Sequence, residues 1–158
     1  MTPMRRFGGN TNLVRTGDPP VSLGSLVFEQ TFSATLDHKN STLQELLAAL
    51  GAAGLFFGED DASGVHLVLD EALINAVTHG SQSDPAKSIR VRAFSSAEKW
   101  SVLVEDQGNG FREEDLPDPL APENLHAESG RGILLIRKMM SEATYYRGGS
   151  ALLISRRR

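Results

Sequence analysis

The chain has 158 residues, the length of one domain, and its 40% hydrophobic and 23% charged residues are ordinary for a globular protein. The net charge of −4 argues against a nucleic-acid-binding surface, because phosphate backbones are held by clustered Lys and Arg. Cysteine is absent, which excludes thiolate chemistry, and no apolar run reaches the roughly 18 residues of a membrane span. We therefore expect a cytoplasmic protein that binds neither nucleic acid nor a membrane.

The N-terminal part of the chain divides into an arm and the start of a domain. Residues 1–23 are rich in Gly, Pro, Thr and Asn without periodicity, so we expect a flexible arm there and a folded domain over residues 24–158. Residues 26–36 favour a strand. A helix with a leucine face should follow, capped within residues 40–42 and ended by Gly51.

A second helix opens at residues 60–63 and stops at Gly80, because its apolar residues recur with a helical period. Two hairpins are predicted, one from residues 88–95 and 99–105, the other from 143–147 and 151–155. A third helix is predicted over 130–140, and the arginine run 156–158 is interpreted as a solvated tail. This order predicts an α+β fold, a two-layer sandwich of a mixed sheet with three helices on one face.

Three short motifs carry candidate chemistry. The first is Asp70 to Gly80 on the second helix, where Glu71 and Asn75 lie one turn apart beside the apolar stripe. Such a polar row is also found where a helix simply meets solvent. An amide oxygen near a carboxylate is, however, what Mg²⁺ prefers, since it takes oxygen ligands and keeps several waters.

The second motif, Glu105 to Gly110, places an acidic residue at a strand end before two glycines. Asp106 is suited to accept a hydrogen bond from a purine amino group, and glycines allow close approach of a ligand, although short Asp-Gly strings are common in turns. The third motif, Ser129 to Ile136, puts glycines at a helix start, where free backbone N–H groups favour a phosphate.

In this order and on these elements, the motifs resemble those of the GHKL superfamily of ATP-binding domains, which includes gyrase and the sensor histidine kinases. Residues 70–80 are similar to its N box, 105–110 to its G1 box and 129–136 to its G2 box. The resemblance spans about residues 26–155 and implies the Bergerat-type ATP-binding fold.

The resemblance also implies roles for individual residues. Asn75 would ligate Mg²⁺, Asp106 would bind the adenine amino group, and Gly108 and Gly110 would shape the adenine end of the pocket. Ser150 stands about where many members have a Thr that reaches adenine through water, and the hydroxyl is kept.

For the phosphate end, the resemblance implies that Gly130 and Gly132 bring backbone amides to the phosphates and that residues 111–129 form a mobile lid over ATP. Arg131 could add positive charge near the phosphates, although an Arg at a helix start is also accounted for by solvation.

Within the superfamily, Glu71 four residues before Asn75 and the following His79-Gly80 look most like bacterial anti-sigma factor serine kinases. Sensor histidine kinases usually have Asn or Asp in place of Glu71 and need a phosphorylatable histidine, for which His38, expected in an exposed loop, is poorly placed. The resemblance thus implies a homodimer that sequesters a sigma factor and phosphorylates a Ser or Thr of an anti-sigma antagonist protein, with Glu71 as the general base.

Two other functions fit the same residues. One is a regulatory module that binds ATP without turnover and acts on its partner by contact alone. The other is a small ATPase in which Glu71 activates water instead of a protein hydroxyl.

Overall fold

Seven strands form one sheet in the computed structural model, which describes residues 5–6, 12–15, 17–56, 58–108 and 140–158. The strand order is β1-β2-β6-β7-β5-β4-β3. Neighbours pair antiparallel except β2 and β6, which are parallel, so the sheet is mixed as predicted. The strands are β1 (Arg5–Arg6), β2 (Asn12–Val14), β3 (Ser25–Ser33), β4 (Ser88–Ser95), β5 (Lys99–Asp106), β6 (Glu142–Tyr146) and β7 (Ala151–Arg157).

Helix α1 (Leu36–Ala52) begins earlier than predicted. Its N-cap is Thr35, whose side chain accepts a hydrogen bond from the His38 N–H at 3.2 Å. The predicted cap at residues 40–42 is therefore wrong, because Thr35 already satisfies an N–H of the first turn. His38 is exposed in that first turn, with its Nδ1 2.7 Å from the Thr35 hydroxyl, rather than in a loop.

Helix α2 (Glu59–Asn75) continues into one π-helical turn, Ala76–Gly80, and ends at Gly80 as predicted. In that turn the Ser81 N–H donates to the Ala76 carbonyl at 2.9 Å. An ion pair joins the two helices, with Nζ of Lys39 on α1 lying 2.6 Å from Oδ1 of Asp70 on α2. The Lys39 side chain is only 6% exposed, so this contact fixes α2 against α1 in a poorly hydrated place.

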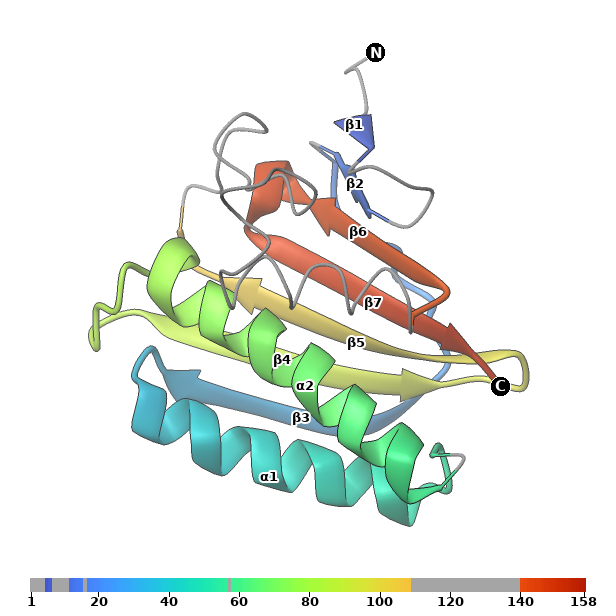
Figure 1. Ribbon diagram of the computed structural model, residues 1–158. Helices are drawn as coiled ribbons and strands as arrows, with labels where there is room; N and C mark the ends of the chain where they lie inside the picture. Colours follow the sequence, from blue (N-terminus) through green and yellow to red (C-terminus); the bar gives the residue numbers. More distant parts are fainter. Residues whose placement is uncertain (1–4, 7–11, 16, 57, 109–139) are drawn as a thin grey trace, which may run out of the picture.

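Both helices cover the same face of the sheet, which gives the predicted two-layer α+β sandwich (Figure 1). Leucines and valines at helical spacing pack on alternate residues of the central strands. The helices contribute Leu46, Leu50, Val68, Leu69 and Leu73, and the strands contribute Val91, Val102 and Ile154. The predicted third helix lies outside the described residues except for its last position, residue 140. None of the helices in the described ranges is long and apolar enough to cross a membrane.

The N-terminal residues add to one edge of the sheet and to the face away from the helices. Strands β1 and β2 extend its edge beside β6, and the connection from β2 to β3 passes behind the sheet (Figure 1). Leu23 in that connection is buried with Leu103 and Leu153 on the face away from the helices. The prediction of no fold element within residues 1–23 differs from the structure at these two strands, because edge pairing uses backbone groups and leaves no apolar period.

The C-terminal arginines are part of the fold. Strand β7 runs to Arg157, and Nη1 of Arg156 lies 2.5 Å from Oδ1 of Asp61 on α2. Both of these side chains are less than 20% exposed. The interpretation of residues 156–158 as a solvated tail is therefore wrong, because composition alone does not show that a terminal charge has a partner.

Candidate functional site

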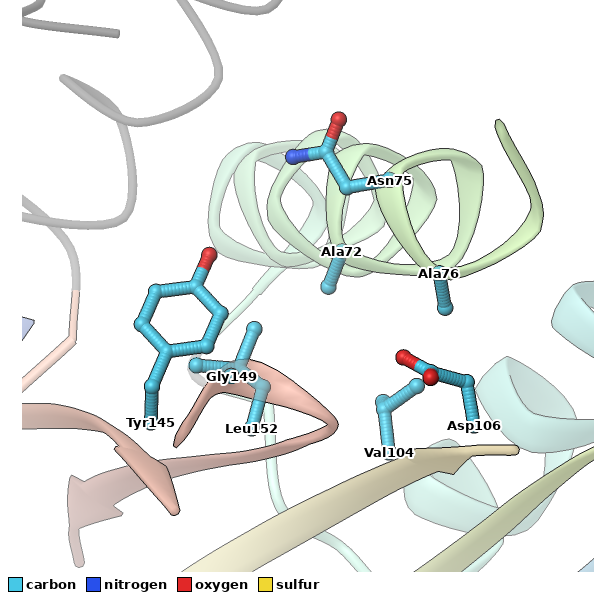
Figure 2. A pocket seen from close by; sticks show the side chains of 8 residues that line it. All are labelled: Ala72, Asn75, Ala76, Val104, Asp106, Tyr145, Gly149 and Leu152. Atoms are coloured by element: carbon cyan, nitrogen blue, oxygen red, sulfur yellow. The ribbon is translucent and has the colours of Figure 1, made fainter. Parts of the chain in front are cut away.

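A pocket opens between α2 and the strands β5, β6 and β7, with about 270 Å³ of empty space that partly joins bulk solvent. In Figure 2, α2 and its last turn form one wall, β5 supplies the floor, and the C-terminal strands supply the opposite wall. The lining is mostly apolar and consists of Ala72, Asn75, Ala76, Val104, Asp106, Tyr145, Gly149 and Leu152. Apolar walls with a few polar groups are typical of small-molecule sites.

Asp106 ends β5 and is partly buried at the floor of the pocket. Burial raises the pKa of its carboxyl to about 6, although a hydrogen bond from the Gly108 N–H and the charge of Lys87 act in the opposite direction. The Gly108 N–H donates to Oδ1 at 2.7 Å, and the Asp106 N–H donates to the Ser150 carbonyl at 2.8 Å. The carboxylate is thus a fixed acceptor in a poorly hydrated place, suited to an amino group of a ligand.

Two glycines let the chain close around this carboxylate. A Cβ at Gly80 would collide with Oδ2 of Asp106 and lie 2.5 Å from its Cγ. A Cβ at Gly108 would collide with the Gly80 carbonyl oxygen and lie 2.8 Å from Oδ1 of Asp106. Any side chain at either position would push the end of α2 away from β5, so both glycines are needed for close approach.

Asn75 is the polar residue of α2 that lines the pocket. Ala72 and Ala76 point toward the strands, whereas the Asn75 amide points away from Asp106 (Figure 2). Glu71, one helical turn before Asn75, is only 7% exposed. The site therefore has an end marked by Asp106 and an end marked by Asn75, with apolar residues between them.

Tyr145 of β6 lines the pocket and is influenced by the charges of both Glu71 and Asp106. Its hydroxyl points toward α2 in Figure 2. Burial, together with the negative charges of Glu71 and Asp106, raises the pKa of Tyr145 to about 12. The phenol therefore stays protonated and able to donate, and Glu71 lies close enough to the pocket to act on one of its lining side chains.

The structure brings Ser150 next to Asp106 through its backbone. Its side chain is buried, and its hydroxyl contacts the Arg147 carbonyl at 3.5 Å, while its neighbour Gly149 lines the pocket. The other predicted site residues, Gly110, Gly130, Arg131 and Gly132, and the predicted lid at 111–129, lie outside the described residues.

Sequence reasoning missed Gly80 and Tyr145 as parts of this site. The sequence identifies Gly80 as the end of a helix and of the first motif, without a contact to Asp106, because that packing joins residues far apart in the chain. Tyr145 had a usable signal, since period-two alternation from Ala143 places it on the helix-facing side of the second hairpin.

Residues 32–156 match the family described as the histidine kinase-like ATPase domain. The chain belongs to this family. It is 28% identical over 97 residues to "Serine-protein kinase RsbW" of Bacillus licheniformis, covering 58% of this chain and 61% of that protein. It is 24% identical over 110 residues to "Anti-sigma F factor" of Anoxybacillus flavithermus, covering 68% and 75% of the two chains, and 27% identical over 89 residues to "Anti-sigma F factor" of Clostridium perfringens, covering 55% and 64%.

Membership of the histidine kinase-like ATPase family implies that the ligand of this domain is ATP. Within the ranges that the structure describes, no group of three or more His, Asp or Glu side chains is arranged to hold a metal ion. These side chains therefore do not form a metal site by themselves, and a cation here would need further oxygen ligands from a nucleotide or from water.

Proposed function

We propose that this ATPase domain binds ATP with Mg²⁺ and transfers the γ-phosphoryl group to a Ser or Thr of an anti-sigma antagonist protein. The observation that carries the proposal is the Asp106 carboxylate, partly buried at the floor of an apolar pocket and enclosed by the Gly80 and Gly108 backbones. The names of the relatives, a serine-protein kinase and anti-sigma factors, support the choice of reaction.

The described residues fit an adenine ring. Ala72, Ala76, Val104 and Leu152 offer flat apolar walls, and the Asp106 carboxylate can accept a hydrogen bond from the exocyclic amino group. A guanine ring carries a carbonyl oxygen at that position, which would face the carboxylate and be repelled. The pocket therefore supports selection of ATP over GTP.

The residues also fit a nucleotide-bound magnesium ion. Asn75 would supply one neutral oxygen ligand at the end of the pocket away from Asp106, and phosphate oxygens and water would supply the others. The ion would supply neutralisation of the phosphate charge. Gly110, Gly130, Arg131 and Gly132 stay predictions for the remaining nucleotide contacts.

Glu71 is the proposed general base. Glu71 is shielded from solvent and lies one helical turn before Asn75, which supports a role for its carboxylate near the phosphates. The acceptor hydroxyl oxygen would bond to the γ-phosphorus while the bond from that phosphorus to the β,γ-bridging oxygen breaks. The hydroxyl proton passes to Glu71 and ADP is released.

We further propose that the domain acts in the cytoplasm as a homodimer that holds a sigma factor on one surface and presents the nucleotide side to the antagonist. Phosphorylation of the antagonist would prevent it from displacing the sigma factor. The relatives named anti-sigma F factor support the choice of a sigma factor as partner.

Two measurements test the proposal. Thermal unfolding with Mg²⁺ and either ATP or GTP should show a higher midpoint with ATP alone, because a ligand that binds only the folded state stabilises it. A single-turnover assay with γ-labelled ATP and candidate antagonist proteins should then label the antagonist, and Asn75→Ala should weaken the Mg²⁺ dependence of binding.

The outcomes separate the three functions. Label on the antagonist supports the kinase, whereas free phosphate released without an acceptor identifies an ATPase. A clear ATP-induced shift with neither product identifies a module that binds without turnover. A melting curve that does not respond to ATP contradicts all three.

A further inference from the structure

The turn between β6 and β7 has an unusual backbone. Its three residues, Arg147, Gly148 and Gly149, have φ angles of 52°, 69° and 119°, all in the left-handed region. Glycine accepts this conformation easily, but a residue with a Cβ does not. An arginine at the first position therefore needs a compensating interaction.

The Arg147 side chain has two such interactions. Its Nε donates to Oδ1 of Asp18 at 2.8 Å, and its Nη1 donates to Oε2 of Glu105 at 2.7 Å. Although burial acts to raise the pKa of Glu105, hydrogen bonds from Arg92 and Arg147 hold it below its usual value. Glu105 is thus an ionised, 7%-exposed anchor on the sheet face away from the helices.

The backbone of the N-terminal segment is bonded to the same turn. The Arg15 N–H donates to the Tyr145 carbonyl at 2.8 Å, and the Gly148 N–H donates to the Arg15 carbonyl at 2.9 Å. The Arg147 N–H donates to the Gly17 carbonyl, also at 2.9 Å. Three backbone bonds and one ion pair therefore join Arg15, Gly17 and Asp18 to this hairpin.

The opposite side of the turn belongs to the pocket. Gly149 lines it, and the Ser150 carbonyl holds the Asp106 N–H. Arg147 also donates a hydrogen bond to Glu105, the residue directly before Asp106. The turn thus lies between the N-terminal segment and Asp106, whose carboxylate is proposed to bind the adenine amino group.

We propose that Arg147 is a positioning residue for the nucleotide pocket, and that docking of Arg15, Gly17 and Asp18 on the 147–149 turn sets the affinity for ATP. The proposal rests on the nucleotide site proposed above. Because coupling between two sites is reciprocal, ATP in turn tightens the docking of this segment. Detachment of this segment, on the sheet face away from the helices, would therefore weaken ATP binding in the pocket.

The test compares ATP affinity with stability in the full chain. The variants are Asp18→Ala, Arg147→Gly, Arg147→Lys and the double variant Asp18→Ala/Arg147→Gly. Lys99→Ala is the matched control, because it breaks a 3.9 Å ion pair with Glu142 on the same sheet without touching the turn. Calorimetry gives Kd for ATP with Mg²⁺, and thermal unfolding without nucleotide gives Tm.

We expect Asp18→Ala to raise Kd about 3-fold, as suits an ion pair with an 80%-exposed partner, and Arg147→Gly to raise it about 10-fold. Arg147→Lys should fall between wild type and Arg147→Gly, and the double variant should match Arg147→Gly. Lys99→Ala should stay within about 2-fold. Glycine relieves the left-handed backbone, so Tm should change little. ATP should also slow hydrogen exchange of the Arg147 and Gly148 amides.

Contrary results are distinct. Unchanged Kd for ATP in Asp18→Ala and Arg147→Gly would overturn the proposal. If Tm were lowered in the same variants, the contacts of Arg147 would serve only to stabilise the fold. A raised Kd in Arg147→Gly without any change in Asp18→Ala would overturn the coupling to the N-terminal segment. Failure of the wild-type chain to bind ATP would instead overturn the nucleotide site itself.

Discussion

Replacing Asp106 by Asn should stabilise the protein without nucleotide and remove its response to ATP. The ordinary Asp pKa of 3.8 is raised to about 6 here, with burial as the largest cause, so the fold holds the ionised carboxylate at a cost. That difference is equivalent to about 3 kcal/mol at most. Because the carboxyl is only partly buried, solvent screening reduces the expected gain from Asp106→Asn to about 1–2 kcal/mol at pH 7.5.

The pH dependence gives the sign of this effect. A carboxyl with a raised folded pKa destabilises the fold where it is ionised, and this cost is fully present above pH 6. As pH falls from about 6 toward 3.8, the folded protein takes up the proton first, so wild type should gain stability relative to the variant. The advantage of Asp106→Asn should thus shrink to nothing near pH 4. ATP affinity of the wild type should also fall below pH 6, as the acceptor is lost.

Thermal and guanidinium unfolding between pH 4 and 8, with and without ATP, measures both effects. For a chain of this length, 1–2 kcal/mol corresponds to a rise in Tm of about 2–8 °C at pH 7.5. Asp37→Asn is the control, because Asp37 is an exposed acidic residue in the first turn of α1 and its loss should slightly lower Tm. An Asp106→Asn variant with a lower Tm than wild type at pH 7.5, or with a difference that does not change with pH, would refute the reasoning.

Three further predictions follow from the same geometry. Glu71→Gln should bind ATP normally and lose phosphoryl transfer by about 10²–10⁴-fold in a single-turnover assay, and an unchanged rate would place the base elsewhere. Gly108→Ala should lower Tm and abolish the ATP-induced shift because its Cβ has no room, whereas Gly51→Ala in α1, where the nearest atom is 3.7 Å away, should stabilise by about 0.5–1 kcal/mol. Asp70→Ala should cost about 3 kcal/mol in urea unfolding by leaving the Lys39 ammonium buried, and adding Lys39→Met should recover most of the loss; additive losses would show that the pair is not coupled.

The sequence predicts the architecture well where burial is periodic. The apolar stripe from Val65 to Ala76 and the alternation of residues 88–95 follow directly from which side of each element faces the core. The mixed sheet under helices on one face is confirmed by the structure and by the family match. Asn75 and Asp106 line one pocket and the charge of Glu71 acts on its lining residue Tyr145, but the roles of all three stay proposals.

Contacts between distant residues are what the sequence does not predict. The pairing of β2 with β6 and the partner of Arg156 each depend on geometry set by the whole fold. The packing of Gly80 on Asp106 belongs to the same class, because a glycine needed for clearance looks identical to one that ends a helix. Local pattern thus identifies elements, and only their assembly identifies what each end of an element touches.

The two proposed functional carboxylates share one such assembled feature. Asp70 precedes Glu71 on α2, and Glu105 precedes Asp106 on β5. Each preceding residue is held by an ion pair in which one side chain is nearly buried. Asp70 pairs with the buried Lys39, and the buried Glu105 pairs with arginines.

Successive side chains differ by about 100° on a helix and by about 180° on a strand, so the anchor points away from its functional neighbour. An ion pair can therefore fix the backbone at Glu71 and at Asp106 without occupying the pocket. The residues that hold each functional carboxylate in place are therefore different from the residues that contact a ligand. This arrangement is also why substitutions at Lys39 or Arg147, which the pocket does not contain, should change how the protein uses ATP.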